Sequence, residues 1–135
     1  MSQANTKKQT QAGLYDFAAD PSAGAIGTIF LGVYFPAKSV ITRFFVKTII
    51  APLSGGAATL AFNSRNTPDA TLPVTPLMVA NAFGAFVLNT ALSGVDFNAT
   101  PANVLSAQQV RMAIAGAPIT AGKLLFVIEY QELDF

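Results

Sequence analysis

The strongest constraint on the fold is a stretch of β-branched and aromatic residues that runs from Ser39 to Phe62. Its first part, Ser39 to Ile50, is rich in Val, Ile, Thr and Phe, which suit a pleated, half-buried surface. Gly55 and Gly56 permit the backbone angles of a turn, and a second short strand, Ala58 to Phe62, follows. The stretch therefore predicts an antiparallel hairpin.

Alternation within the first strand predicts which of its faces enters a core. Successive side chains of a strand point to opposite faces of the sheet. The predicted core face consists of Val40, Thr42, Phe44, Val46, Thr48 and Ile50. The other face mixes apolar groups with two cations, so we expect it to be only partly covered; it consists of Ile41, Arg43, Phe45, Lys47 and Ile49.

The rest of the chain repeats this pattern of short strands separated by turns. Gln109–Ala115 and Lys123–Gln131 alternate in the same way and predict a second hairpin, while the polar segment Asn63–Ala70 is a predicted loop. Ten Gly and eight Pro supply the turns, and no alternation of strands with helices appears. These features predict an all-β fold, an antiparallel β-sandwich of jelly-roll-like form.

The length of 135 residues predicts one domain, preceded by a short polar arm. We expect the arm at 1–13 and the β-sandwich at 14–135. A polar segment of this kind is either a disordered tail or an arm that lies on a neighbouring subunit. The predicted partner contacts are Lys7, Lys8, Leu14, Tyr15 and Phe17.

The surface of this protein must be unusually poor in charge. Apolar residues form 52% of the chain and charged residues 11%, against roughly 25% charged in an average soluble domain. Either the surface is rich in neutral polar residues, or much of it is covered by other copies of the chain or by a partner. We favour the second explanation. A net charge of +1 gives no electrostatic reason to expect a nucleic acid. We expect no membrane partner, because no apolar run is long enough to span a bilayer.

The sequence lacks the residues on which most catalytic sites depend. It contains no His and no Cys, which removes the commonest general base, the commonest metal ligand and the thiolate nucleophile. Its seven acids are scattered, and no calcium-loop or phosphate-loop motif occurs. We therefore predict no enzyme, no catalytic residue, no cofactor and no metal site.

One charged cluster has two interpretations that the sequence leaves open. Because the predicted strands alternate, one sheet face is expected to carry Arg43, Phe45, Lys47, Arg111 and Glu129. This face is either a solvated surface with weak ion pairs or a seam between subunits.

Three segments resemble small virion proteins of tailed bacteriophages, most closely the head decoration or cement class. They are Pro36–Thr48, Ser54–Phe62 and Ile119–Tyr130. The resemblance implies a β-sandwich or jelly-roll homotrimer that binds the major capsid protein or another virion protein. It implies a non-enzymatic role in stabilising the assembled head. The protein would then reside in the virion, after assembly in the host cytoplasm.

A second function class stays open. The chain is alternatively a carbohydrate- or receptor-binding module of a phage fibre or tail, or of a cell surface. The absence of Trp weakens this alternative, since such modules often stack sugars on exposed aromatic rings.

Overall fold

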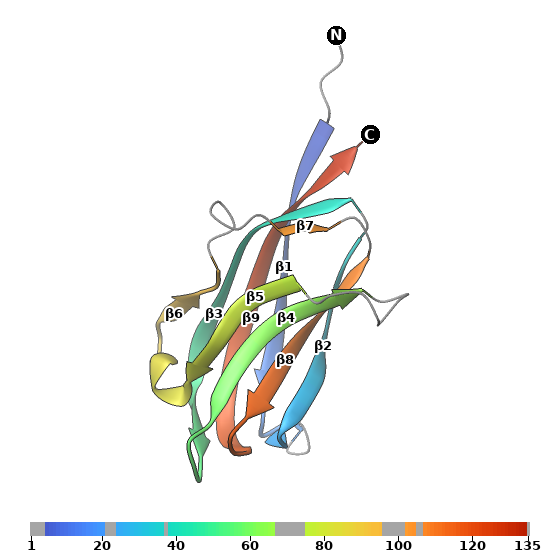
Figure 1. The fold of residues 1–135 in the computed structure, drawn as a ribbon. Helices are drawn as coiled ribbons and strands as arrows, with labels where there is room; N and C mark the ends of the chain where they lie inside the picture. The colour runs from blue at the N-terminus through green and yellow to red at the C-terminus, as the bar shows by residue number, and fades with distance from the viewer. Residues whose placement is uncertain are drawn as a thin grey trace.

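A computed structural model shows two antiparallel β-sheets packed face to face (Figure 1). It describes residues 5–20, 24–36, 38–66, 75–95, 102–104 and 107–134. In these ranges sheet A has the strand order β1-β9-β3-β6, with β7 also paired to β3, and sheet B has the order β2-β8-β4-β5. The strands are β1 Asn5–Asp16, β2 Gly27–Phe35, β3 Ser39–Ser54, β4 Thr59–Asn66, β5 Thr75–Ala82, β6 Ala91–Ser93, β7 Ala102–Val104, β8 Gln108–Ala115 and β9 Ile119–Asp134. A short 3-10 helix, η2 Phe83–Ala85, follows β5.

The connectivity is that of a jelly roll. The strands pair from the outside of the sequence inward: β1 with β9, β2 with β8, β3 with β6, and β4 with β5. Successive pairs alternate between the two sheets, and the roll then brings β9 beside β3 and β8 beside β4. The predicted antiparallel, jelly-roll-like β-sandwich is confirmed.

Both predicted hairpins are wrong, although their strands exist. β3 lies in sheet A and β4 in sheet B; β8 lies in sheet B and β9 in sheet A. Each partner has one buried face, so the two strands pack across the core instead of forming a ladder. The β3–β4 connection and the β8–β9 connection, which both pass from one sheet to the other, lie close together. Gly116 has a φ of 86°, and a Cβ there would overlap the carbonyl oxygen of Ala57.

The faces of β3 differ from strict alternation because the strand contains irregularities. Phe44, Val46 and Thr48 are buried as predicted, but Ile41 is also buried and Thr42 and Ile50 are exposed. Its pairing with β9 shifts register between Ile41 and Arg43 and again between Thr48 and Ile50. A bulge adds one residue to a strand, which turns all later side chains to the opposite face.

Three aromatic rings join the two sheets at the centre of the core. Phe44 of β3 lies 5.4 Å from Phe62 of β4, and Phe62 lies 6.4 Å from Phe126 of β9, measured between ring centroids. All three side chains are buried. Tilted ring pairs at such distances add to the stability that burial provides.

The described part of the expected arm, residues 5–13, is held by its own chain. β1 pairs with β9 along its whole length, from Asn5 opposite Asp134 to Asp16 opposite Lys123. Over residues 5–13 the arm is thus neither a disordered tail nor a segment that only a neighbouring subunit holds, the two alternatives that the sequence left open, and β1 runs through the expected boundary at residue 13 without a break. The division into an arm and a sandwich domain stays a prediction.

Candidate interaction face

The outer face of sheet A carries an apolar band that crosses three strands. In the strand registers, Ala12, Val127 and Phe45 form one row, and Leu14 and Leu125 begin the next. Leu14 is 50% exposed, whereas Phe45, Leu125 and Val127 are part-buried. We call these five residues the apolar band.

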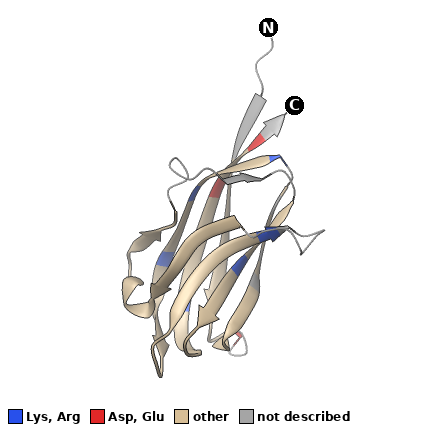
Figure 2. Ribbon diagram, viewed as in Figure 1, with Lys and Arg blue, Asp and Glu red and all other residues tan. Residues whose placement is uncertain are grey.

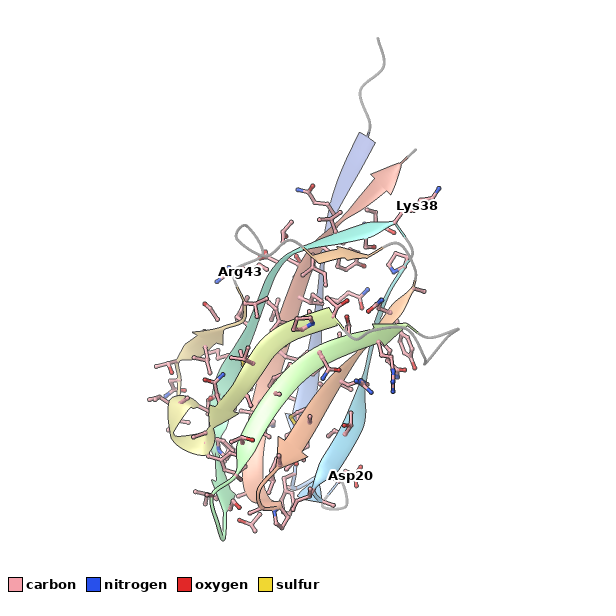
Figure 3. The ribbon with its side chains drawn as sticks, in the orientation of Figure 1. Asp20, Lys38 and Arg43 are labelled. Carbon is pink, nitrogen blue, oxygen red and sulfur yellow. The ribbon has the colours of Figure 1, made fainter. Side chains whose placement is uncertain are left out.

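Two ion pairs flank the apolar band. The Arg43 Nη1 atom lies 3.8 Å from Glu129 Oε2, and the Lys123 Nζ atom lies 3.9 Å from Asp16 Oδ2. The Arg43 guanidinium also sits 4.5 Å from the centroid of the Phe45 ring, and Figure 3 shows Arg43 pointing away from the sandwich. Long, partly exposed pairs contribute little to stability. They instead give the apolar band a charged rim, the usual arrangement of a protein interface.

Residues from two separate sequence predictions, the partner contacts and the charged seam, meet on this face. Leu14, a predicted partner contact, lies in the same row as Lys47 and Leu125. Arg43, Phe45 and Glu129 occupy the rows beside it, so four of the five predicted seam residues share the face. Their roles in partner contact stay predictions.

The remaining predicted residues lie elsewhere. Tyr15 is only 4% exposed and belongs to the core, and Phe17 is part-buried and packs against that core. Arg111 lies on β8 of sheet B, so the expectation that it shares a face with Arg43 is wrong. Lys7 and Lys8 lie in β1, but their side chains fall outside the described parts of the structure.

A hollow of about 410 Å³ lies beside the end of β1. Its lining is mainly apolar with two carboxylates: Leu14, Tyr15, Asp16, Ala19, Asp20, Ile29 and Leu31. Burial raises the pKa of Tyr15, and the charges of Asp20 and Asp16 raise it further. Its phenol therefore stays protonated at neutral pH and is no candidate nucleophile.

The described residues offer neither a metal site nor a membrane-spanning helix. No three Asp, Glu, His or Cys side chains among them gather closely enough to hold a metal ion. None of their helices is long and apolar enough to cross a membrane.

Chains with a similar fold occur in two solved phage capsids. The acidic stable capsid structure of Helicobacter pylori bacteriophage KHP30 contains a chain with a TM-score of 0.63 and 9% sequence identity; the match covers 95% of this chain and 92% of that one. The capsid of Ralstonia phage GP4 contains another with a TM-score of 0.57 and 15% identity, covering 98% and 86%. No family model and no curated protein sequence matches the chain. At these identities the likeness shows a shared fold and nothing finer.

Proposed function

We propose that this protein is a non-enzymatic structural protein of a phage virion. The observation that carries the proposal is the match of nearly the whole chain to jelly rolls in two phage capsids. The sequence supports a non-enzymatic role, since it offers neither His nor Cys for catalysis. Its low charge content fits a surface that other virion subunits cover.

Within the virion we propose the role of a decoration or cement protein, which binds the assembled head as a homotrimer. The outer face of sheet A is the proposed contact surface, because its apolar band and charged rim have the composition of an interface. Binding only to the assembled shell would stabilise the shell by mass action.

The projecting ends of β1 and β9 are the proposed reaching element. Figure 1 shows both strands extending together beyond the body of the sandwich. Their pairing, Lys7 opposite Glu132 and Lys8 opposite Gln131, makes this a two-stranded ribbon in place of the single arm predicted from sequence. We propose that the ribbon contacts a neighbouring subunit.

Val127→Glu tests the contact surface, because it places a charge at the centre of the apolar band. We expect light scattering to show loss of self-association, and purified heads depleted of this protein to bind far less of the variant. Val87→Glu is the matched control, since Val87 is 54% exposed and lies outside the strands of both sheets, between η2 and β6. Equal assembly and head binding by both variants would rule out the proposed face, and a wild-type protein that neither associates nor binds heads would rule out the decoration role.

Glycan recognition is the competing function, and a direct glycan-binding measurement distinguishes it from the decoration role. Tyr34 on β2 is 53% exposed. Among the described residues it is the only aromatic one with a large exposed apolar side chain. Saturable binding of the isolated protein to one glycan class, abolished by Tyr34→Ala, would replace the decoration role with this alternative.

A further inference from the structure

Two arginines stand side by side on the outer face of sheet B. In the register of β4 with β8, Asn63 lies opposite Arg111, and Arg65 lies opposite Gln109. The intervening residues, Ser64 and Val110, are buried, so Arg65 and Arg111 both point outward. Residues related in this way are diagonal neighbours on one sheet face, within reach of long side chains.

The polar contacts of the two guanidinium groups are incomplete. The Nε atom of Arg111 donates a hydrogen bond of 2.8 Å to Asn63 Oδ1, a neutral acceptor. The Nε atom of Arg65 is shielded from solvent and has no hydrogen-bond partner. Burial lowers the pKa of Arg111, and the positive charge of Arg65 lowers it further. A shielded donor without an acceptor costs free energy, so the Arg65 side chain gains when it turns toward solvent and meets an acceptor from another molecule.

Sheet B offers these arginines no negative charge of its own. None of β2, β4, β5 and β8 contains Asp or Glu, and Figure 2 shows blue segments on β4 and β8 with no red segment on these strands. The acids in the described ranges lie in β1, in β9 or in the turn after β1. The ion pairs found between described residues both belong to sheet A. An ion-pair partner for either arginine must therefore come from outside these strands.

We propose that Arg65 and Arg111 bind a carboxylate of a neighbouring protein, presented by an acidic strand or loop that lies along β4 and β8. The planar guanidinium fork matches a carboxylate through two parallel hydrogen bonds. A nucleic acid fits less well, because its binding relies on many cations along a phosphate backbone and this chain has a net charge of +1. The flanking outward residues of the central strands, Ala61 and Ala113, leave room for such a segment. This site does not depend on the virion role.

Fluorescence anisotropy with labelled hexaglutamate and the full chain tests the proposal at low salt. The wild type should bind the peptide saturably, and Arg65→Gln and Arg111→Gln should each weaken binding about fivefold or more. Lys38→Gln is the matched control, because it changes the net charge equally at the turn between β2 and β3 (Figure 3) and should alter affinity less than about twofold. Equal losses in all three variants, or no loss in any, would overturn the site.

Three further measurements distinguish the proposed carboxylate site from its alternatives. In the wild type, the Nε–Hε signal of Arg65 in an NMR spectrum should shift when hexaglutamate is added, which needs no variant; an unmoved signal counts against the site. Hexathymidylate should bind more weakly than the peptide, and the reverse order would assign the site to nucleic acid. Asp69, the acid nearest to Arg65 in sequence, is removed by Asp69→Asn. Peptide binding that appears only in this variant would show that the chain neutralises its own arginines.

Discussion

Gly13 is the position at which a single methyl group should most clearly disturb the attachment of β1. It lies opposite Phe126 in the register of β1 with β9. A Cβ at Gly13 would come within 2.8 Å of the Cε1 and Cε2 atoms of Phe126 and closer still to its Cζ atom. The Phe126 ring is fully buried and packs against Phe62, so a movement of the ring disturbs other core residues.

Two opposing effects decide the sign of the change in Gly13→Ala. Replacing Gly by Ala lowers the entropy of the unfolded chain and stabilises by about 0.4–1 kcal/mol where the site tolerates it. Overpacking a filled core costs about 1–3 kcal/mol. The clash should win, with a net loss of about 1–2 kcal/mol in the free energy of unfolding. Unfolding entropy of about 2.1 cal/mol/K per residue converts this loss, for 135 residues, to a Tm lower by about 4–7 °C.

Urea and thermal unfolding measure this loss, and Gly55→Ala is the matched control. A Cβ at Gly55 meets no atom within 4 Å, so that variant should be neutral or slightly more stable than wild type. Adding Phe126→Leu to Gly13→Ala should cost less than the sum of the two single changes, since the smaller side chain relieves the clash. A Gly13→Ala protein as stable as the wild type would refute the close approach of β1 to the core.

Three further outcomes follow from the geometry. Phe62→Ala removes the ring between Phe44 and Phe126 and should lower the free energy of unfolding by about 3–5 kcal/mol in urea titrations. Arg43→Gln, at a side chain that is 58% exposed, should change stability by less than about 1 kcal/mol, and less still in concentrated salt. Because burial and then Asp20 and Asp16 raise the pKa of Tyr15, stability should fall as the pH rises past the ordinary tyrosine value of about 10, and Tyr15→Phe should flatten that fall more than Tyr34→Phe does.

Alternation in the sequence predicts strands well and their partners poorly. The residues of β8 and β9 alternate regularly because each strand has one buried face, and β3 alternates between its irregularities for the same reason. The same signal arises whether the next strand lies beside it in a ladder or across the core. The jelly roll uses the second arrangement for β3 with β4 and for β8 with β9, which the local pattern does not distinguish.

Polar residues at the end of β4 show a second limit of the sequence pattern. The segment after Phe62 looks like a loop, but β4 continues to Asn66, so that part of the predicted loop is wrong. Ser64 is buried there and donates a hydrogen bond of 2.7 Å to Gln108 Oε1 on β8. A partner 44 residues away satisfies this hydroxyl, and only the tertiary fold reveals it. The same extension of β4 places Arg65 on a sheet face, which is why the sequence pattern missed it.

The two outer faces of the sandwich differ in a way that bears on how the molecule meets its neighbours. Sheet A has an apolar band whose flanking charges are already paired within the chain. Sheet B has two cations and no acid in any of its strands. Paired charges around an apolar centre permit contact with a neutral surface, whereas unpaired arginines favour an acidic one. We therefore expect the two faces to meet different surfaces, so that Val127→Glu and Arg65→Gln should weaken separate contacts and their effects on assembly should add.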